Sequence, residues 1–182
     1  CESDAMVYNV TQTGTTGGTY SAVPNGGLFI DVNTGAITPS LSSPGIYTVS
    51  YSLPGSGACV GANPSTQVEI APLPNIVQPA NVQACNNYAL PALAVGNYFD
   101  APGGTGNQLS AGYLVTATQT FYIYAVSNLG CTNEVSFTVN ITTVPTPTAN
   151  VTQTTCTVQT GNIEVSTPLG TNYEYSIDGT TY

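Results

Sequence analysis

TFYIYAVSNLGCTNEVSFTVNI, the stretch from Thr120 to Ile141, alternates apolar and polar residues on both sides of a short loop. Successive side chains of a β-strand point to opposite faces, so a period of two predicts a strand with one buried face. The residues predicted to share such a face are Phe121, Ile123 and Ala125 in the first half, and Val135, Phe137, Val139 and Ile141 in the second. The stretch therefore predicts two strands, and we expect the second set of residues in a core.

The rest of the chain resembles this stretch in composition. It is rich in Thr, Val, Ile and Tyr, is interrupted by Gly and Pro, and has no long segment with a period of 3.6 residues. GIYTVSY, from Gly45 to Tyr51, is a further extended segment. Short strands with turn residues at regular intervals are typical of β-sandwiches. The sequence therefore predicts an all-β fold made of tandem immunoglobulin-like β-sandwich modules.

Two proline-bearing connectors reveal a repeat. Val68 precedes Cys85 by 17 positions, and Val139 precedes Cys156 by the same 17 positions. The offset between the two connectors is 71 residues, which suits a small sandwich module. Proline in a connector favours extended, semi-rigid spacing. We expect one module over residues 1–72, a second over 73–145, and the first part of a truncated third over 146–182.

Positively charged side chains are absent from the whole chain. The 182 residues include no Lys, Arg or His and nine acidic residues, for a net charge of −9; average usage predicts about twenty Lys and Arg. This composition argues against binding to nucleic acid or to anionic membrane surfaces. It also excludes catalysis that depends on histidine or lysine. We expect no enzymatic activity, and proteases that cut after Lys or Arg find no site.

The five cysteines predict disulfides in an oxidising, extracellular setting. They form no CxxC pair and no histidine accompanies them, which disfavours zinc. A cysteine opens each module and another precedes its last strand, so we predict bridges Cys1–Cys59 and Cys85–Cys131, with Cys59–Cys85 as an alternative. Cys156 would then pair beyond Tyr182. Cys1 could instead be the lipidated first residue of a bacterial lipoprotein.

Two turn-like motifs have alternative interpretations. DVNTG carries oxygen ligands at alternate positions, Asp31 and Asn33, followed by Gly35, and calcium loops share that spacing. The further acids of a calcium loop are missing, so we favour an Asx turn over a Ca²⁺ site and expect no cofactor or metal. Asp178-Gly179 predicts a type I′ hairpin turn.

Tyrosines and acids are the remaining candidate site residues. The chain has twelve Tyr and no Trp. Strand tyrosines usually cover half-buried sheet surface, but Tyr122 and Tyr124 are candidates for stacking on a sugar. A glycosidase needs two facing carboxylates, and the nine acids are spread thinly along the chain.

The order of the motifs carries a resemblance to a known family. The motifs GGTY (Gly17–Tyr20), NTGAI (Asn33–Ile37) and PGIYTVSY (Pro44–Tyr51) precede Cys59, and this first segment resembles a repeat of very large secreted surface proteins of Bacteroidota. The segment from Asn81 to Ile141 resembles a companion module of the same proteins. The C-terminal segment, which contains YSIDG (Tyr175–Gly179), resembles the SprB-like adhesin repeat. The resemblance implies an extended cell-surface adhesin, exported by type IX secretion and associated with gliding motility or attachment.

We therefore expect an extracellular structural and adhesive segment of a long, protease-resistant surface filament. Its expected partners are neighbouring repeats of the same protein, and surface glycans or other chains in a filament. The sequence contains no run of eighteen apolar residues, so it predicts no membrane span. The alternative is a carbohydrate-binding or spacer module of a secreted enzyme.

Overall fold

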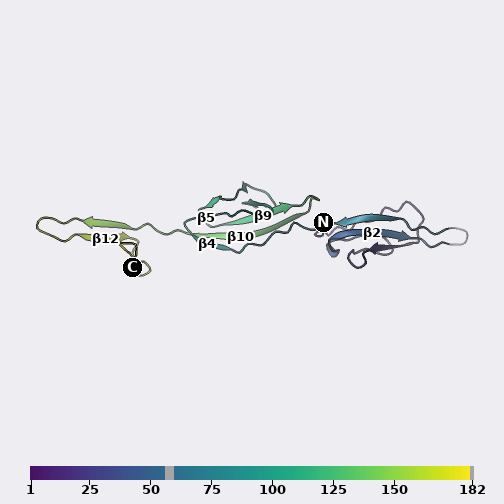
Figure 1. The fold of residues 1–182 in the computed structure, drawn as a ribbon, viewed down its shortest axis with the longest axis horizontal. Helices are drawn as coiled ribbons and strands as arrows, with labels where there is room; N and C mark the ends of the chain where they lie inside the picture. The colour runs from purple at the N-terminus through teal and green to yellow at the C-terminus, as the bar shows by residue number, and fades with distance from the viewer. Residues whose placement is uncertain (56–59, 181–182) are drawn as a thin grey trace.

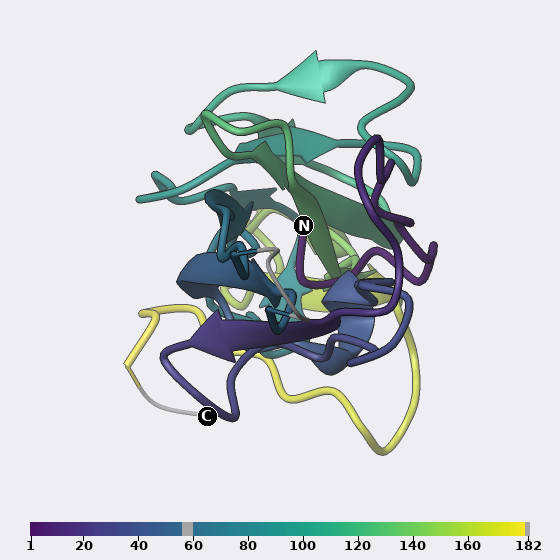
Figure 2. The same cartoon turned by 90° about the vertical axis from the view of Figure 1, so that its right-hand side faces the viewer.

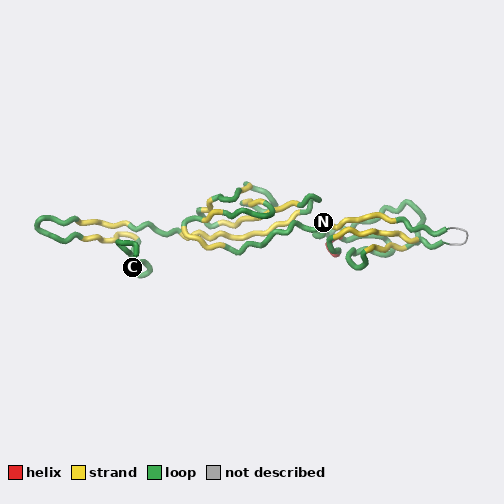
Figure 3. Tube along the Cα trace, in the orientation of Figure 1, coloured by secondary structure: helices red, strands yellow, loops and turns green. Residues whose placement is uncertain are grey.

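The structure, a computed structural model, describes residues 1–55 and 60–180. These residues form an elongated row of β-structure, with the N-terminus lying inside the row rather than at its end (Figure 1). A single 3-10 turn, η1 (Pro39–Leu41), is the only helical element in the described ranges (Figure 3). No described helix is long and apolar enough to cross a membrane. The all-β prediction is confirmed.

The first unit, residues 1–72, is built on a three-stranded antiparallel sheet. Its strands, in the order β1-β2-β3, are β1 (Thr19–Val23), β2 (Gly45–Ser52) and β3 (Ser65–Ile70). Isolated bridges of Tyr8 and Ile30 to Ile37 form a second layer over this sheet. The buried cluster that lies between the layers comprises Tyr20, Leu28, Ile37, Tyr47, Val49 and Ile70.

The second unit, residues 73–145, has a larger sheet of five strands. In spatial order these are β4 (Val82–Cys85), β10 (Thr132–Thr142), β9 (Gln119–Val126), β6 (Asn97–Phe99) and β7 (Gln108–Leu109). A two-stranded sheet of β5 (Tyr88–Ala89) and β8 (Leu114–Val115) supplies a second layer. The buried cluster comprises Leu90, Tyr98, Val115, Phe121, Ile123, Phe137 and Val139.

The alternation in residues 120–141 gives the two longest paired strands of the second unit. Phe121, Ile123 and Val139 are completely buried, and Phe137 is 4% exposed. Val135 and Ile141 are partly buried and pack against the same cluster. The predicted core face is confirmed, because the period of two survives in β9 and β10 without a register shift.

The parallel pairing of β4 with β10 decides where the cysteines lie. The register places Val82 beside Val139 and Cys85 beside Thr142. Both strands therefore end at the same end of the second unit, where the chain leaves for residues 146–182. Cys131 lies just before β10, at the opposite end. Eleven residues of strand separate the two places, which is about 36 Å at 3.3 Å per residue.

The third segment, residues 146–182, contains one hairpin of β11 (Thr148–Thr152) and β12 (Asn162–Thr167). Its apolar side chains remain exposed, with Val151 at 58% and Ile163 at 56%. The predicted type I′ turn at Asp178-Gly179 is wrong, because only Gly179 of the pair has a positive φ and a type I′ turn needs two. The preceding tyrosine segment lies outside the named strands.

No described sheet crosses the predicted module boundaries at residues 72 and 145. Seen along the long axis, the units overlap in projection, because they follow one another in a row (Figure 2). The first and second units are each two-layered. Their immunoglobulin-like character and the division into three modules stay predictions.

Candidate functional site: a disulfide-braced junction

A disulfide joins the first unit to the second. Cys1 and Cys131 are bonded with their Cα atoms 5.5 Å apart, although 130 positions separate them in the sequence. Cys131 is 1% exposed, so the second unit holds its half of the bond in a buried place. The N-terminus accordingly lies between the two units (Figure 1). The bond spans the junction instead of closing a loop within one unit.

Glu2 clamps the chain where it leaves the first unit. The backbone N–H of Glu2 donates to the carbonyl oxygen of Ala71 at 3.0 Å. The Glu2 carboxylate accepts a hydrogen bond from the backbone N–H of Leu73 at 2.8 Å. Ala71 is 6% exposed, and the Cys131 sulfur lies 3.9 Å from its carbonyl oxygen. The N-terminal residues thus pack on the connector from which the second unit begins.

Side chains of the second unit hold the rest of this connector. Asn133 donates from Nδ2 to the carbonyl oxygen of Pro74 at 2.9 Å. Gln78 donates from Nε2 to the carbonyl oxygen of Ser136 at 2.7 Å. Farther along, the Asn81 Oδ1 accepts from the backbone N–H of Thr138 at 2.8 Å. The connector therefore lies along β10, fixed by bonds to its beginning and middle.

The predicted disulfide pairs are corrected by this arrangement. Cys1 is bonded to Cys131, so neither Cys1–Cys59 nor Cys85–Cys131 forms. The physical reason is the parallel β4–β10 pairing, which separates Cys85 from Cys131 by far more than the 4.4–6.8 Å that a disulfide allows between Cα atoms. Cys85 carries a free thiol, which also removes Cys59–Cys85. Cys59 itself lies outside the described residues.

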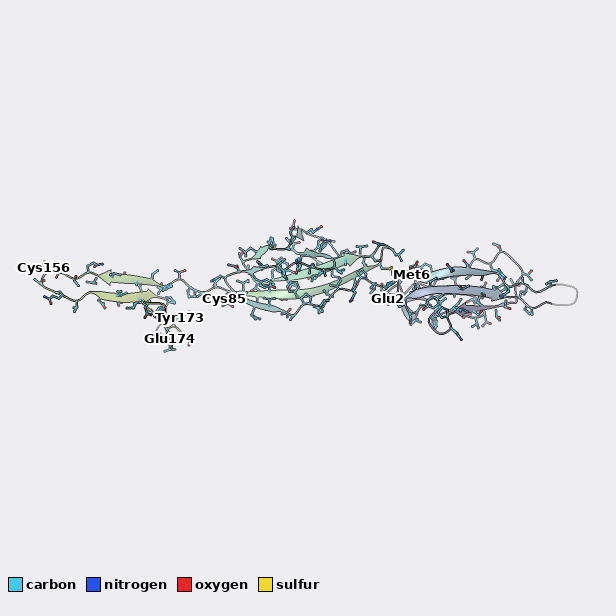
Figure 4. The ribbon with its side chains drawn as sticks, viewed as in Figure 1. Glu2, Met6, Cys85, Cys156, Tyr173 and Glu174 are labelled. Atoms are coloured by element: carbon cyan, nitrogen blue, oxygen red, sulfur yellow. A yellow bond between two sulfur atoms is a disulfide. The ribbon has the colours of Figure 1, made fainter. Side chains whose placement is uncertain are left out.

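The sulfur of Cys1 is committed to the disulfide. A lipoprotein carries its lipid on that same atom, so the lipidated alternative for Cys1 is inconsistent with the structure. Cys85 and Cys156 are free and exposed. They lie far apart along the row, with Cys85 at the end of the second unit and Cys156 at the outer end of the third segment (Figure 4).

The exit from the second unit has a clamp of its own. The backbone N–H of Asn86 donates to the carbonyl oxygen of Thr142 at 2.9 Å. The Asn86 Oδ1 accepts from the backbone N–H of Val144, also at 2.9 Å. Asn86 has a φ of +65°, a conformation that asparagine tolerates better than most residues. Sequence reasoning missed both clamps, because the residue after the cysteine is Glu in one and Asn in the other.

The DVNTG motif forms a turn built on its own side chain. The Asp31 Oδ1 accepts hydrogen bonds from the backbone N–H groups of Asn33 and Thr34, each at 2.8 Å. These bonds, the one from Thr34 first, hold the pKa of the Asp31 carboxyl below its usual value. Gly35 completes the turn at a φ of +72°. Within the described ranges no three His, Cys, Asp or Glu residues are grouped so as to hold a metal ion.

The tyrosines proposed for stacking lie in β9, on the face opposite the core. Tyr122 and Tyr124 are both half-buried. The ring of Tyr124 meets Phe99 edge-on at a centroid distance of 6.2 Å, and Gly104 lies so close to it that an added Cβ would stand 2.6 Å from the ring. One side of Tyr124 is thus occupied by the protein. Sugar stacking at these two rings stays a prediction.

An apolar cavity of about 410 Å³ lies in the first unit, beside a different pair of tyrosines. The rings of Tyr20 and Tyr51 are 4.8 Å apart at their centroids. The Tyr51 hydroxyl accepts hydrogen bonds from the backbone N–H of Gly18 at 2.7 Å and from Nε2 of Gln12 at 2.9 Å. It donates to the carbonyl oxygen of Thr15 at 3.0 Å. Sequence reasoning missed this cavity because residues from three separate segments line it.

Comparison with known proteins adds no relative: no family model matches the chain, and no curated protein matches it.

Proposed function

We propose that this chain is an extracellular structural and adhesive segment of a long cell-surface filament, built from immunoglobulin-like modules. The observation that carries the proposal is the Cys1–Cys131 disulfide with the Glu2 clamp, because both join one unit to the next. They keep consecutive units in a fixed relation.

The end-to-end row supports the same proposal. Units that follow one another in a line (Figure 1) reach farther from a cell than units packed side by side. The Glu2 carboxylate of the first unit accepts a hydrogen bond from Leu73 of the second, beside the Cys1–Cys131 disulfide, so a bend at this place would break the hydrogen bond and strain the cross-link. A stalk needs this resistance to bending.

Charge and chemistry support an exposed location. A chain with a net charge of −9 and no cation repels its own copies, which keeps long arrays apart and soluble. A disulfide persists in oxidising compartments outside the cytoplasm. The absence of Lys and Arg leaves no bond for trypsin-like proteases. The family resemblance adds three points to the proposal: attachment to surfaces, a role in gliding motility, and export by type IX secretion.

Surface labelling of native cells tests the proposal. An antibody to residues 1–145 should stain intact cells, and trypsin treatment should leave the staining unchanged. A protease that cuts after acidic residues should remove it, since Glu and Asp are present throughout the row. Cells that lack the protein should adhere less to a surface. Staining that appears only after lysis, or unchanged adhesion of the deletion strain, would overturn the proposal.

The cavity beside Tyr20 and Tyr51 favours a second candidate, a carbohydrate-binding or spacer module of a secreted enzyme. Aromatic rings next to hydroxyl and amide groups suit a sugar, whose faces are apolar and whose edge is polar. A glycan array probed with the chain should then show saturable binding. The variant Tyr51→Ala should lose it while Tyr122→Ala keeps it. A blank array removes this candidate.

A further inference from the structure

The strands β3 and β10 are equivalent parts of the first and second units. Each is the last strand of its unit, and Val68 of β3 precedes Val139 of β10 by 71 positions. The clamp bonds have the same offset, because their acceptors Ala71 and Thr142 are also 71 positions apart. The repeat therefore extends to individual hydrogen bonds, and the outer edges of the two strands can be compared residue by residue.

The outer edge of β10 is covered by another part of the chain. β4 pairs in parallel with the end of β10. Before that pairing begins, the Ser136 carbonyl oxygen accepts a hydrogen bond from Gln78, and the Thr138 N–H donates one to Asn81. Val139, which lies between these bonds and the end of the strand, is completely buried. An extended segment added in parallel thus completes this sheet.

The corresponding edge of β3 is open. Tyr51 donates its backbone N–H to Pro64, so every second residue from Pro64 onward bonds β2. The residues between them, Ser65, Gln67 and Glu69, direct their backbone N–H and C=O groups away from β2. Within the ranges that the structure describes, these groups have no hydrogen-bond partner. The counterparts of the first two, 71 positions later in β10, are the residues that bond the connector.

Two hollows lie beside this open edge, each bordered by residues of β3 and of the N-terminal segment. The smaller, of about 310 Å³, is bordered by Val68 and Glu69, and the larger is the cavity of about 410 Å³, bordered by Ser65. Val10 borders both, and it is 40% exposed while Tyr8 beside the smaller hollow is 51% exposed. Val68 is only half-buried, although its counterpart in β10 is completely buried. Apolar surface is thus left uncovered where the second unit has an added strand.

Charge decides between a second copy of this chain and a different protein as the occupant. Glu69 and Asp4 both border the smaller hollow, and the chain has no cation to place beside them. A second copy carries the same net charge of −9 and would repel the first. A strand that brings a Lys or Arg to Glu69 is attracted instead.

We propose that the open edge of β3 binds an extended peptide segment of a different protein, added in parallel as β4 is added to β10. The segment has apolar side chains at alternate positions, which enter the two hollows, and a Lys or Arg opposite Glu69. Its backbone bonds the free N–H and C=O groups of Ser65, Gln67 and Glu69, which is the usual mode of strand addition at a sheet edge. This binding activity goes beyond the stalk function and does not depend on it.

The register of β4 on β10 supplies a probe peptide. Transferred by 71 positions, that register puts the place of Gln83 beside Glu69. The probe therefore has the sequence QPANVQA of residues 78–84 with the change Gln83→Lys, and blocked ends that remove the terminal charges. It stops at Ala84 because Cys1 holds the next place on β3, as Cys85 does on β10.

A titration of the full chain with this peptide, followed residue by residue by NMR hydrogen exchange, tests the proposal. Binding should be saturable, and exchange of the Gln67 and Glu69 amides should slow. The Val68 amide is an internal control, because it already bonds β2 and should change little. Equal changes at all three amides, or none, would overturn the proposal. So would slow exchange at Gln67 and Glu69 before any peptide is added, which would mean that the protein itself or a second copy covers the edge.

Variants separate the backbone bonds from the charge. Gln67→Pro removes one N–H of the open edge without touching the β2 ladder, so it should abolish binding and leave the urea midpoint nearly unchanged. Glu69→Gln should weaken binding of the Lys peptide by up to about fivefold, whereas Glu164→Gln, a matched exposed acid on β12, should change nothing. Equal effects of the two Glu variants, or equal binding of a peptide with Glu in place of the Lys, would overturn the proposal. Surface staining of cells does not involve this edge, so the stalk proposal and the strand-binding proposal can fail separately.

Discussion

The cross-junction disulfide makes a quantitative prediction for a chain pulled by its two ends. Because Cys1 is bonded to Cys131, tension applied at the N-terminus passes through the bond directly to β10. The backbone between these cysteines carries no load, and neither the first unit nor most of the second can be extended. Reduction of the bond, or the variant Cys131→Ser, puts 130 positions of chain under tension.

The length released follows from the geometry of an extended chain. At about 3.5 Å per residue, 130 positions correspond to about 450 Å of contour length. The residues after Cys131 contribute about 180 Å on the same basis, and they extend in either redox state. The reduced chain should therefore extend more than three times as far as the oxidised one.

Optical tweezers or an atomic force microscope, with handles at residues 1 and 182, measure this difference directly. The oxidised chain should show no extension step that belongs to the first unit, and a reductant should add the missing length in the same molecule. Cys85→Ser is the matched control, since the Cys85 thiol is free and its removal should change nothing. Full extension of the oxidised chain would refute the reasoning.

Three further predictions concern stability. Glu2→Ala should cost about 1 kcal/mol of unfolding free energy and speed hydrogen exchange in the connector, whereas Glu2→Gln keeps the acceptor and should cost less; equal effects would contradict the clamp. Phe121→Ala should cost about 3–5 kcal/mol in urea unfolding, because the ring is completely buried, while Val126→Ala at an exposed end of the same strand should cost under about 0.5 kcal/mol. Hydrogen bonds, from Thr34 first, hold the pKa of Asp31 below its usual value, and hydrogen bonds from Asn107 do the same for the pKa of Asp100. In acid the unfolded chain therefore binds more protons than the folded chain. The stabilising contribution of these two carboxylates should be complete above the unfolded pKa near 4 and should be lost as the pH falls through the lower folded pKa values. Urea unfolding midpoints measured between pH 5 and 2 would detect this loss. A midpoint that does not change with pH, or a double variant Asp31→Asn and Asp100→Asn with the same pH profile as the unchanged chain, would contradict the prediction.

Local alternation was sufficient to predict the long strands β9 and β10. Phe121, Ile123, Phe137 and Val139 recur with a period of two, and a strand in contact with a core can satisfy that pattern in only one way. The 71-residue repeat of the connectors was also present in the sequence, and it reappears in the hydrogen bonds at Ala71 and Thr142. These features depend on near neighbours or on counting along the chain.

The turn at Asp178-Gly179 shows the limit of local signals. The dipeptide favours a type I′ turn only when two flanking strands pair across it. The segment around Tyr175 lies outside the named strands, and the turn takes another conformation. The tyrosine cavity was hidden for a related reason, since Tyr20, Tyr51 and Val10 come together only after β1 has paired with β2.

The amino-acid sequence is enough to predict the all-β fold, the buried faces of the long strands and the spacing of the repeat, because each of these follows from side-chain period or from position along the chain. Which cysteines meet depends on the tertiary structure. Val82–Cys85 pairs with β10 in parallel, a contact between segments more than fifty residues apart, and that pairing moves Cys85 to one end of its unit and leaves Cys131 at the other. A disulfide needs its Cα atoms within about 7 Å, so the direction of one short strand turned an expected bond within a unit into a bond across the junction.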